Sequence, residues 1–479
     1  MSTIPVSVES MKRVERVQPK SARKFAVHSP IDGAAFAEVA DCGAEEARRA
    51  SDRAASGFAA WKETTAYERS AILRRWLTLM QANEPEMARI MALEMGKPVT
   101  EGLGEMRYAE SFVEWYAEEA KRVYGETVPS QFAHKRALVL KQPSGVVYAI
   151  TPWNFPYATV TRKIAPALAA GCSVILKPAE QTPVSALYLG ALWEEAGGPA
   201  DVLQVLTALD PVPVSDVLID DPRVRVLTFT GSTEVGMHLY ARCAKTMKRL
   251  ALELGGHAPF LVFADADLDA AVREVAACKF RNAGQTCVCV NRIYVHQDIA
   301  AEFTDRLARK AASLRVGDPM DPATEIGPLV NVQGLEKVQA HVSDAIGKGA
   351  RAAIGGRALH GLYFEPTVLT GIKPDMLLMR EETFGPVAPV ISFSTDAEAV
   401  RLANATPYGL ASYLWTRDLG RAMRVGEALE YGIVGVNDGV PSTAQAPFGG
   451  RKNSGIGREG GRWGMDEFLD VKHLSIALP

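Results

Sequence analysis

Short β-rich runs alternate with longer helical stretches from Gly145 onward, and this rhythm constrains the fold more than any other feature. The runs cover residues 146–150, 174–176, 202–206 and 225–229, and the helical stretches cover residues 157–170, 182–196, 213–219 and 232–247. Because such alternation requires right-handed crossovers, it predicts a parallel, doubly wound sheet with helices on both faces. Sheets of this class bind ligands beyond the carboxyl ends of their strands.

The rest of the chain divides around this unit. Residues 44–120 have helical periodicity, with stretches at residues 45–60 and 67–95, whereas residues 121–142 are strand-like. A second α/β series covers residues 258–431, and a glycine-rich tail from Pro447 ends in a β-like stretch at residues 473–478. Since 479 residues are too many for one hydrophobic core, we expect an α/β protein with more than one domain.

Composition argues against several kinds of partner. The formal net charge is −3 and no long basic run occurs, which disfavours nucleic acid and anionic membranes. The longest nearly apolar stretch, residues 165–176, is shorter than the roughly 20 residues of a membrane-spanning helix. The basic N-terminal region lacks the apolar segment of a secretory signal. The 6 cysteines show neither a disulfide framework nor a zinc-binding spacing. We therefore expect a cytoplasmic protein that binds no metal, nucleic acid or membrane.

A glycine-rich segment near the C-terminus resembles a dinucleotide-binding loop only superficially. Gly455-Ile-Gly457-Arg-Glu-Gly460 matches the motif letter by letter. The motif requires a preceding strand, a following helix and an acidic residue about 20 positions further on. Too few residues follow Gly460 to complete that unit, so we interpret the segment as a structural turn.

One cysteine stands out as a candidate nucleophile, in the run Arg281-Asn-Ala-Gly-Gln-Thr-Cys287-Val-Cys289. The small residues before Cys287 let the backbone approach a ligand, and a nucleophilic thiol needs that access and a group that favours the thiolate. Taken alone, a cysteine is more often a small buried hydrophobic residue. We interpret Cys289 as a neighbour without a catalytic role, with reversible oxidation of the pair as the alternative.

The run ending at Cys287 resembles the active-site signature of the aldehyde dehydrogenase family, and Leu252-Glu253-Leu-Gly-Gly-His257 resembles the second signature of that family. Further matches follow in the order of the family: Thr151-Pro-Trp-Asn-Phe-Pro156, Lys177-Pro-Ala-Glu180, Phe229-Thr-Gly-Ser-Thr-Glu-Val-Gly236 and Glu381-Glu-Thr-Phe-Gly-Pro386. The similarity extends from about residue 25 to the C-terminus.

This resemblance implies roles for three catalytic residues. Cys287 would attack the aldehyde to form a thiohemiacetal, and the Asn154 amide and the Cys287 backbone N–H would hold its oxyanion. After hydride transfer, Glu253 would activate the water that hydrolyses the thioester. That task suits a carboxylate whose pKa is raised by an apolar flank.

The resemblance also implies a nicotinamide cofactor. Gly231 and Ser232 would bind the pyrophosphate, because free N–H groups at the start of a helix favour phosphate. A carboxylate at Glu180 can bind the adenosine ribose hydroxyls but would repel the 2′-phosphate of NADP. Many relatives that use NADP carry a small hydroxyl residue there, so we predict NAD, with NADP less favoured. The other positions assigned to the cofactor are Trp153, Lys177, Pro178, Ala179, Val235, Leu254, Glu382 and Phe384.

Three residues bear on the choice of aldehyde. Arg162 and Arg281 match positions that bind the distal carboxylate in succinate-semialdehyde dehydrogenases, and Ser442 matches a third carboxylate contact. We therefore predict the oxidation of succinate semialdehyde to succinate, with glutarate semialdehyde or a broader range of aldehydes as alternatives. Departures from the subfamily pattern lie in and after the loop of Ser442 and in helix 232–247: Pro441, Gln445, Ala446 and Met237. A non-catalytic protein and a cysteine hydrolase without cofactor are rival classes.

The family's architecture implies three parts. Residues 1–120 and 145–254 would form a Rossmann-like NAD-binding domain, and residues 255–445 an α/β catalytic domain. Residues 121–144 and 446–479 would form a small β element that bridges subunits. A homodimer or a homotetramer is expected, and the sequence does not choose between them.

Overall fold

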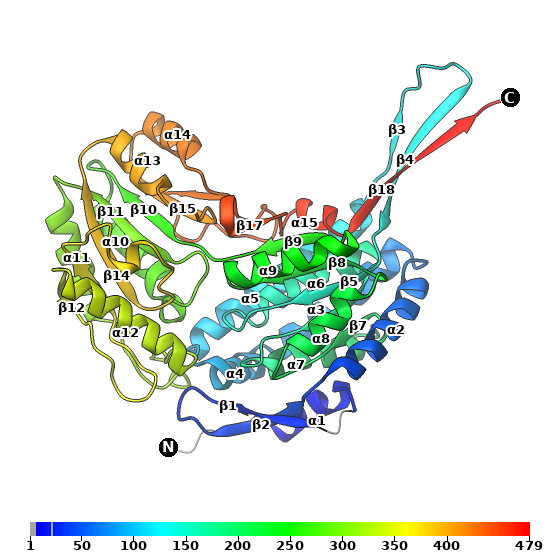
Figure 1. The fold of residues 1–479 in the computed structure, drawn as a ribbon, viewed down its shortest axis with the longest axis horizontal. Coiled ribbons are helices and arrows are strands. Elements are labelled where there is room, and N and C mark those ends of the chain that lie inside the picture. Colours follow the sequence, from blue (N-terminus) through cyan, green and yellow to red (C-terminus); the bar gives the residue numbers. More distant parts are fainter. Residues whose placement is uncertain (1–5, 21–22) are drawn as a thin grey trace.

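The computed structural model describes residues 6–20 and 23–479. Figure 1 shows two α/β lobes side by side, with a β arm projecting from one of them. The first lobe is built on a six-stranded sheet in the order β17-β9-β8-β5-β6-β7. Its strands are β5 (Val146–Ile150), β6 (Ser173–Lys177), β7 (Leu203–Val205), β8 (Val224–Thr230), β9 (Arg249–Glu253) and β17 (Gly455–Ile456).

The strand order of this sheet confirms the predicted doubly wound topology. All neighbouring strands pair in parallel, except that β17 runs antiparallel to β9. The chain winds from β5 through β6 to β7 on one side, and then returns to β8 and β9 on the other side. The order of the strands therefore reverses between β5 and β8, where a crevice for ligands is expected.

Side chains along β5 point alternately to the two faces of the sheet and are apolar on both, which explains why helices cover both faces. Val147 and Ala149 belong to one hydrophobic cluster, whereas Val146 and Tyr148 belong to another on the opposite face. The first cluster includes α1 (Val8–Val17), α3 (Ala66–Ala82), α4 (Glu84–Met95), α5 (Val99–Glu119), α6 (Ala158–Ala170) and α7 (Pro183–Glu195). The second includes α2 (Ala44–Trp61), α8 (Val212–Asp220) and α9 (Thr233–Cys243). The helical stretch 67–95 is two helices, because the chain leaves helical geometry at Asn83 between α3 and α4.

The second lobe contains a seven-stranded sheet in the order β12-β13-β14-β11-β10-β15-β16. Its strands are β10 (Ala258–Val262), β11 (Val290–His296), β12 (Arg351–Ile354), β13 (Thr367–Thr370), β14 (Val387–Phe393), β15 (Ala411–Trp415) and β16 (Ile433–Val436). One face packs on α10 (Leu268–Phe280), α11 (Ala300–Ala312) and α12 (Val332–Gly347), and the other on α13 (Asp396–Asn404) and α14 (Leu419–Ala428). Only β12 pairs antiparallel with its neighbour among the described strands of this sheet.

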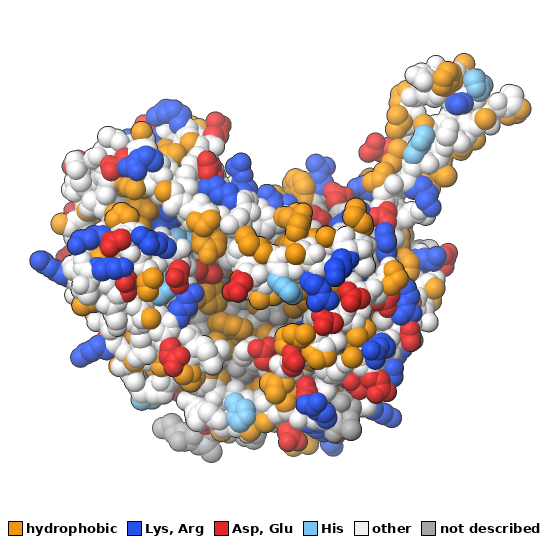
Figure 2. Space-filling view, viewed as in Figure 1, with side chains coloured by type: hydrophobic (Ala, Val, Ile, Leu, Met, Phe, Trp, Pro, Cys, Tyr) orange, Lys and Arg blue, Asp and Glu red, His pale blue; other side chains and the backbone are white. Residues whose placement is uncertain are grey.

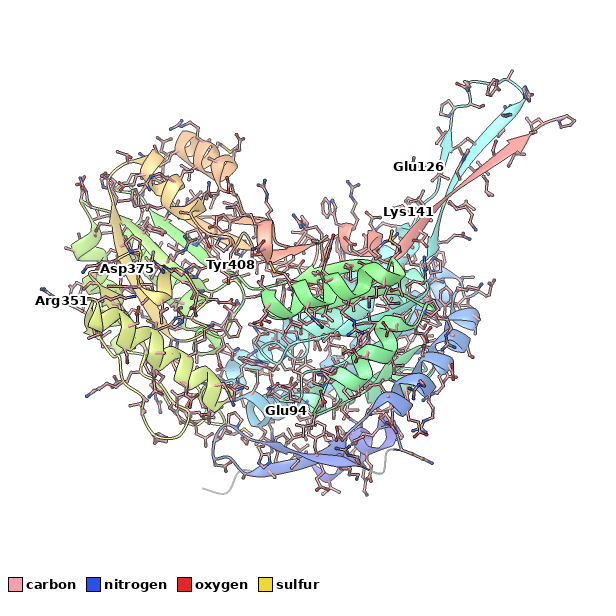
Figure 3. The ribbon with its side chains drawn as sticks, viewed as in Figure 1. Glu94, Glu126, Lys141, Arg351, Asp375 and Tyr408 are labelled. Atoms are coloured by element: carbon pink, nitrogen blue, oxygen red, sulfur yellow. The ribbon has the colours of Figure 1, made fainter. Side chains whose placement is uncertain are left out.

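The arm is a separate antiparallel sheet of three strands in the order β18-β4-β3. Its strands are β3 (Glu126–Val128), β4 (Lys135–Pro143) and β18 (Leu469–Ala477), the last preceded by α15 (Trp463–Asp466). Glu126 and Lys141 mark the lower part of the arm, beyond the body of the lobe (Figure 3). Hydrophobic side chains lie exposed along the arm, among them Val128, Val471 and Leu474 (Figure 2). The small hairpin of β1 (Lys24–His28) and β2 (Ala35–Ala40) completes the described sheets.

Within the described residues 6–20 and 23–479, no helix is long and apolar enough to cross a membrane. In the same part of the chain, no group of three or more His, Cys, Asp or Glu side chains is arranged to hold a metal ion. The boundaries predicted for the domains stay a prediction.

Candidate active site

The topology of the first sheet brings the predicted cofactor residues to one edge. Trp153 follows the carboxyl end of β5, Lys177 ends β6, and Gly231 follows β8. Leu254 follows β9, next to β8. Because the carboxyl ends of parallel strands meet at the same edge, residues from four separate segments face one crevice.

The turn from β8 into α9 has the geometry of a phosphate site. Ser232 caps α9, and its Oγ accepts the N–H of Val235 at 3.3 Å. The Gly231 N–H donates to the Glu253 carbonyl at 3.1 Å. A Cβ at Gly231 would lie 2.3 Å from the Phe229 ring, so only glycine fits there. The remaining free N–H groups at the start of α9 can bind the oxygens of a pyrophosphate.

Beyond β6, a buried amine lies beside a partly exposed carboxylate. Burial lowers the pKa of Lys177, although the nearby Glu180 opposes this shift. The Lys177 Nζ lies 3.8 Å from Glu180 Oε2, and Glu180 Oε1 accepts from Gln181 Nε2 at 2.8 Å. Pro178 and Ala179 are buried in the turn between them. The pair offers both a donor and an acceptor, which suits the hydroxyl groups of a ribose.

The second lobe contributes two of the predicted cofactor residues. Glu382 Oε1 accepts the Gly256 N–H at 3.3 Å, and burial raises the pKa of Glu382 to about 7. Phe384 has a φ of 54°, and its ring lies edge-on to Trp153 with 5.6 Å between centroids. An aromatic pair therefore spans the two lobes beside the crevice. Together with the phosphate and ribose positions, these residues fit a nicotinamide dinucleotide.

The segment before Cys287 has an unusual backbone. Asn282, Ala283 and Gly284 have φ angles of 52°, 53° and 76°, in the left-handed region. A Cβ at Gly284 would lie 2.2 Å from the Gly385 carbonyl oxygen, which explains the glycine. For Asn282 and Ala283 such geometry costs about 1 kcal/mol or more each. It persists because tertiary contacts hold it: the Asn282 N–H donates to Glu101 Oε2 at 2.8 Å.

Asn154 is fixed directly against this segment. Its Nδ2 donates to the Gln285 carbonyl at 3.1 Å. The backbone carbonyl of Asn154 accepts hydrogen bonds from Lys97 Nζ at 2.7 Å and from Asn282 Nδ2 at 3.2 Å. The side-chain amide of Asn154 has a second N–H, so it can donate to an oxyanion formed on Cys287 without losing the bond to Gln285.

The two groups predicted to do the chemistry are both strongly perturbed. Burial raises the pKa of the Cys287 thiol to about 11, while Arg162 opposes this shift and the charge of Glu382 adds to it. Burial, assisted by the charge of Glu459, raises the pKa of Glu253 well above its ordinary value. Glu253 Oε2 is buried and has no hydrogen-bond partner among the described residues. A desolvated carboxyl group of this kind can act as a base near neutral pH.

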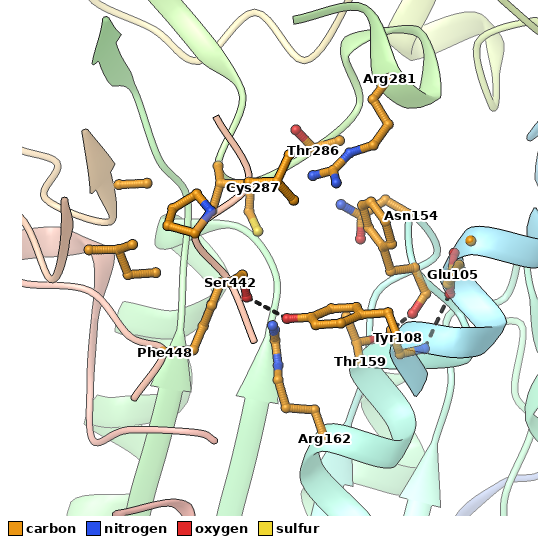
Figure 4. A pocket seen from close by; sticks show the side chains of 18 of the residues that line it. Glu105, Tyr108, Asn154, Thr159, Arg162, Arg281, Thr286, Cys287, Ser442 and Phe448 are labelled. Atoms are coloured by element: carbon orange, nitrogen blue, oxygen red, sulfur yellow. Dashed lines mark hydrogen bonds between the residues drawn. The ribbon is translucent and has the colours of Figure 1, made fainter. Parts of the chain in front are cut away.

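Cys287 lines a cavity of about 310 Å³ that lies between the lobes. Figure 4 shows that Arg162 and Arg281 enter this cavity from opposite sides of Cys287. Ser442 also lines it, from the loop after β16, and its Oγ is hydrogen bonded to the hydroxyl group of Tyr108. The volume is at the lower end of the range for small-molecule sites.

The two arginines differ in their surroundings. Arg162 is buried, forms an ion pair with Glu459, and lies over the Phe448 ring at 4.0 Å from its centroid. Arg281 lies 5.5 Å from the centroid of the Phe155 ring. Within the described chain, no carboxylate lies within ion-pair distance of Arg281, and its buried Nε has no hydrogen-bond partner. Arg281 is therefore the cation of the cavity whose charge remains available to an anion.

Sequence motifs did not identify three residues that the structure places at this site. Tyr108 and Glu101 line the cavity from α5, which matches no quoted motif. Glu459 binds both Arg162 and Lys163, the latter at 2.6 Å. It lies within the glycine-rich segment interpreted as a turn. That segment begins with β17, which pairs with β9 at Glu253.

Comparison with known proteins agrees with the arrangement of residues around Cys287. The sequence profile of the aldehyde dehydrogenase family matches residues 17–474. The chain is 51% identical to 3-sulfolactaldehyde dehydrogenase of Pseudomonas putida over 96% of this chain and 95% of the relative. It is 50% identical to the NADP(+) succinate-semialdehyde dehydrogenase of Escherichia coli K12 over 94% of each. It is 48% identical to glutarate-semialdehyde dehydrogenase of Pseudomonas putida KT2440 over 97% of this chain and 96% of the relative.

A solved structure is similar over the same span. The crystal structure of succinate-semialdehyde dehydrogenase from Burkholderia pseudomallei superposes with a TM-score of 0.95 at 50% identity and covers 96% of each chain. This similarity confirms the predicted α/β fold class with a doubly wound cofactor sheet. The family profile, the sequence identities and the cavity around Cys287 agree. The chain therefore belongs to the aldehyde dehydrogenase family, whose enzymes oxidise aldehydes with NAD(P).

Proposed function

We propose that this protein oxidises an aldehyde carrying a distal carboxylate, with succinate semialdehyde as the substrate and NAD as the cofactor. The observation that carries the proposal is one cavity in which Cys287 lies between two guanidinium groups, those of Arg162 and Arg281. A thiol at that place can attack the aldehyde carbon while a cation binds the acid at the other end of the molecule.

In the first half of the reaction, the Cys287 sulfur attacks the carbonyl carbon and the thiol gives up its proton. Because the pKa of Cys287 is raised to about 11, the thiol needs a base, and the carboxyl group of Glu253 is available for this role. The Asn154 amide and the Cys287 N–H stabilise the oxyanion, a contribution of about 3–4 kcal/mol for one donor in comparable sites. Bound NAD supplies the hydride acceptor.

In the second half, the thioester on Cys287 is hydrolysed. Once the proton taken from the thiol has passed to solvent, Glu253 takes a proton from the water that attacks the acyl carbon and gives it to the departing Cys287 sulfur, which releases the carboxylic acid and restores the thiol. Glu253 lies at the end of β9, where burial keeps its pKa high. The raised pKa makes its carboxylate a stronger base than an ordinary glutamate, as proton abstraction from water requires.

The surroundings of the cavity support an acidic aldehyde. Arg281 has no ion-pair partner among the described residues, and the hydroxyl groups of Tyr108 and Ser442 add donors beside Arg162. Tyr108 and Ser442 satisfy each other in the structure and can turn to an incoming anion. The names of the three relatives each denote an aldehyde with a second acidic group. Glutarate semialdehyde and a sulfonated aldehyde are therefore the competing substrates.

The choice of NAD rests on Glu180. Its carboxylate faces Lys177 across 3.8 Å and would repel a 2′-phosphate. The Escherichia coli relative is named for NADP(+), so this position is the one to test. Glu180→Ser should lower the ratio of kcat/KM for NAD to that for NADP by about tenfold or more, equivalent to about 1.4 kcal/mol. An unchanged ratio would show that another residue sets the preference.

A panel of aldehydes tests the substrate. We expect kcat/KM to be highest for succinate semialdehyde, lower for glutarate semialdehyde and 3-sulfolactaldehyde, and lowest for uncharged butyraldehyde, each measured with NAD and with NADP. Equal efficiency for butyraldehyde would favour an aldehyde dehydrogenase of broad specificity. A higher value for either competing acid would reassign the substrate while leaving the role of Arg281 intact.

We propose further that the arm joins subunits in a homodimer or homotetramer. Val471 is 69% exposed in the single chain, although it is hydrophobic, and Leu474 and Ile476 are exposed on the other face of the same strand. Exposed apolar side chains on both faces of the arm indicate a contact surface. In this proposal, subunit contact is assigned to segments 121–144 and 446–479. Cofactor binding is assigned to residues 1–120 and 145–254, and catalysis to residues 255–445. Sedimentation of the intact protein and of Val471→Asp tests the contact, because the charge should dissociate the assembly.

A further inference from the structure

A lysine and a cysteine that the proposed mechanism does not use lie together behind the nucleophile. Lys279 is in the last turn of α10, and Cys289 directly precedes β11. Neither side chain has any exposed surface. The Lys279 Nζ donates to the Cys289 sulfur at 3.3 Å and to Asn291 Oδ1 at 3.0 Å.

This lysine lacks the partner that buried lysines ordinarily have. Across residues 6–20 and 23–479, no carboxylate lies within ion-pair distance of Lys279. A buried ammonium group without a counter-charge is costly. The Cys289 thiol is the acidic group within hydrogen-bond distance of the amine. The sulfur also faces the Lys279 carbonyl at 3.7 Å, which keeps it against the same residue.

The pair lies one residue from a route to solvent. Val288 and Cys287 line the substrate cavity, and Cys289 follows them in the chain. A small apolar oxidant such as dioxygen can enter that cavity and needs only a local fluctuation to reach the sulfur. Asn291, an amide, accepts from the amine without competing for oxidation.

We infer that Lys279 and Cys289 form a redox modification site in which one oxygen atom bridges Nζ and Sγ. One amine and one thiol react with one dioxygen to give a Lys–NH–O–S–Cys bridge and one water. An N–H bond and the S–H bond are broken, and an N–O bond and an O–S bond form. Nitrogen and sulfur each lose two electrons, and dioxygen accepts all four. Two equivalents of a dithiol return the amine, the thiol and one further water.

The bridge would affect the active site directly. It would replace the lysine charge by a neutral nitrogen; burial raises the pKa of Glu382, and the charge of Lys279 is one of the groups that oppose this rise. It would also tie the segment that carries Cys287 to the end of α10.

Mass spectrometry of the intact, full-length protein tests the inference. After exposure to dioxygen-saturated buffer, we expect a species heavier by one oxygen and lighter by two hydrogens, and absent from protein kept anaerobic. Trypsin should fail to cleave at Lys279 in that species, and fragmentation should join Lys279 to Cys289. Dithiothreitol should abolish it. A Cys287–Cys289 disulfide, which loses two hydrogens and gains no oxygen, formed in place of the bridge would overturn the inference.

Three variants serve as matched controls. Cys287→Ser removes the competing disulfide and should retain the bridged species. Cys289→Ser and Lys279→Arg each remove one partner and should lose it. If Lys279→Arg does not fold, the masses of aerobic, anaerobic and reduced wild-type protein still show whether the bridge forms. The proposed site would be refuted if the bridged species persisted in Cys289→Ser, or if aerobic wild-type protein did not contain it.

Discussion

Replacing Arg281 by leucine tests whether the cavity recognises an acid. Arg281 has no ion-pair partner among the described residues, so its removal breaks no ion pair of the protein. The loss should therefore fall on the substrate. A charged hydrogen bond contributes about 1.5–3 kcal/mol, so Arg281→Leu should lower kcat/KM for succinate semialdehyde by roughly 10- to 150-fold. The main change should be in KM, because the contact is made in both ground state and transition state.

Initial rates of NADH formation measure this effect, with butyraldehyde as the internal control. The uncharged aldehyde makes no use of the guanidinium, so its kcat/KM should change less than about threefold. The matched variant is Arg162→Leu, which strips Glu459 of a partner and should reduce activity toward both aldehydes as well as thermal stability. Equal losses for both aldehydes in Arg281→Leu, or no loss for either, would refute the role of Arg281 as the binding cation.

Three further changes give distinct outcomes. Tyr108→Phe should raise KM for the acidic aldehyde by about 3- to 10-fold, since one neutral hydrogen bond contributes about 0.5–1.5 kcal/mol; an unchanged KM would mean that Tyr108 only orients Ser442. Burial raises the pKa of Glu101 to about 7, and Arg281 lies near enough to oppose that shift. Glu101 should therefore ionise as pH rises through 7 and compete with the substrate for Arg281. KM for the acidic aldehyde should then rise with pH in wild type but not in Glu101→Gln, and parallel pH profiles of KM in the two proteins would contradict this. Asn154→Ala should lower kcat by about 10²–10³, as single-turnover kinetics can measure, and a smaller loss would place the oxyanion elsewhere.

Local patterns were sufficient to predict the parallel sheet. Strand β5 falls at residues 146–150 as predicted, and α6 begins within one residue of its predicted start. The reason is physical: a strand buried on both faces is a continuous apolar run, and the helices between such strands must cover the sheet. The break at Asn83 escaped this reasoning because the apolar spacing continues across it into α4.

Predicting the site from sequence had a different limit. Cys287 and Glu253 each lie in a motif, and their positions in the fold follow from the strands beside them. Tyr108 and Glu101 lie on α5, and only packing between distant segments brings that helix to the cavity. Glu459 matters because it neutralises Arg162 across the core, a contact that no local spacing encodes.

The covalent intermediate on Cys287 is the most direct test of the account. Glu253→Gln should slow hydrolysis more than acylation, so the protein mixed with succinate semialdehyde and NAD and then quenched in acid should carry a succinyl group. Peptide mapping should place that group on Cys287, with none in Cys287→Ser. A succinyl group on another residue, or equal labelling of Cys287→Ser, would contradict the assignment of Cys287 as the nucleophile.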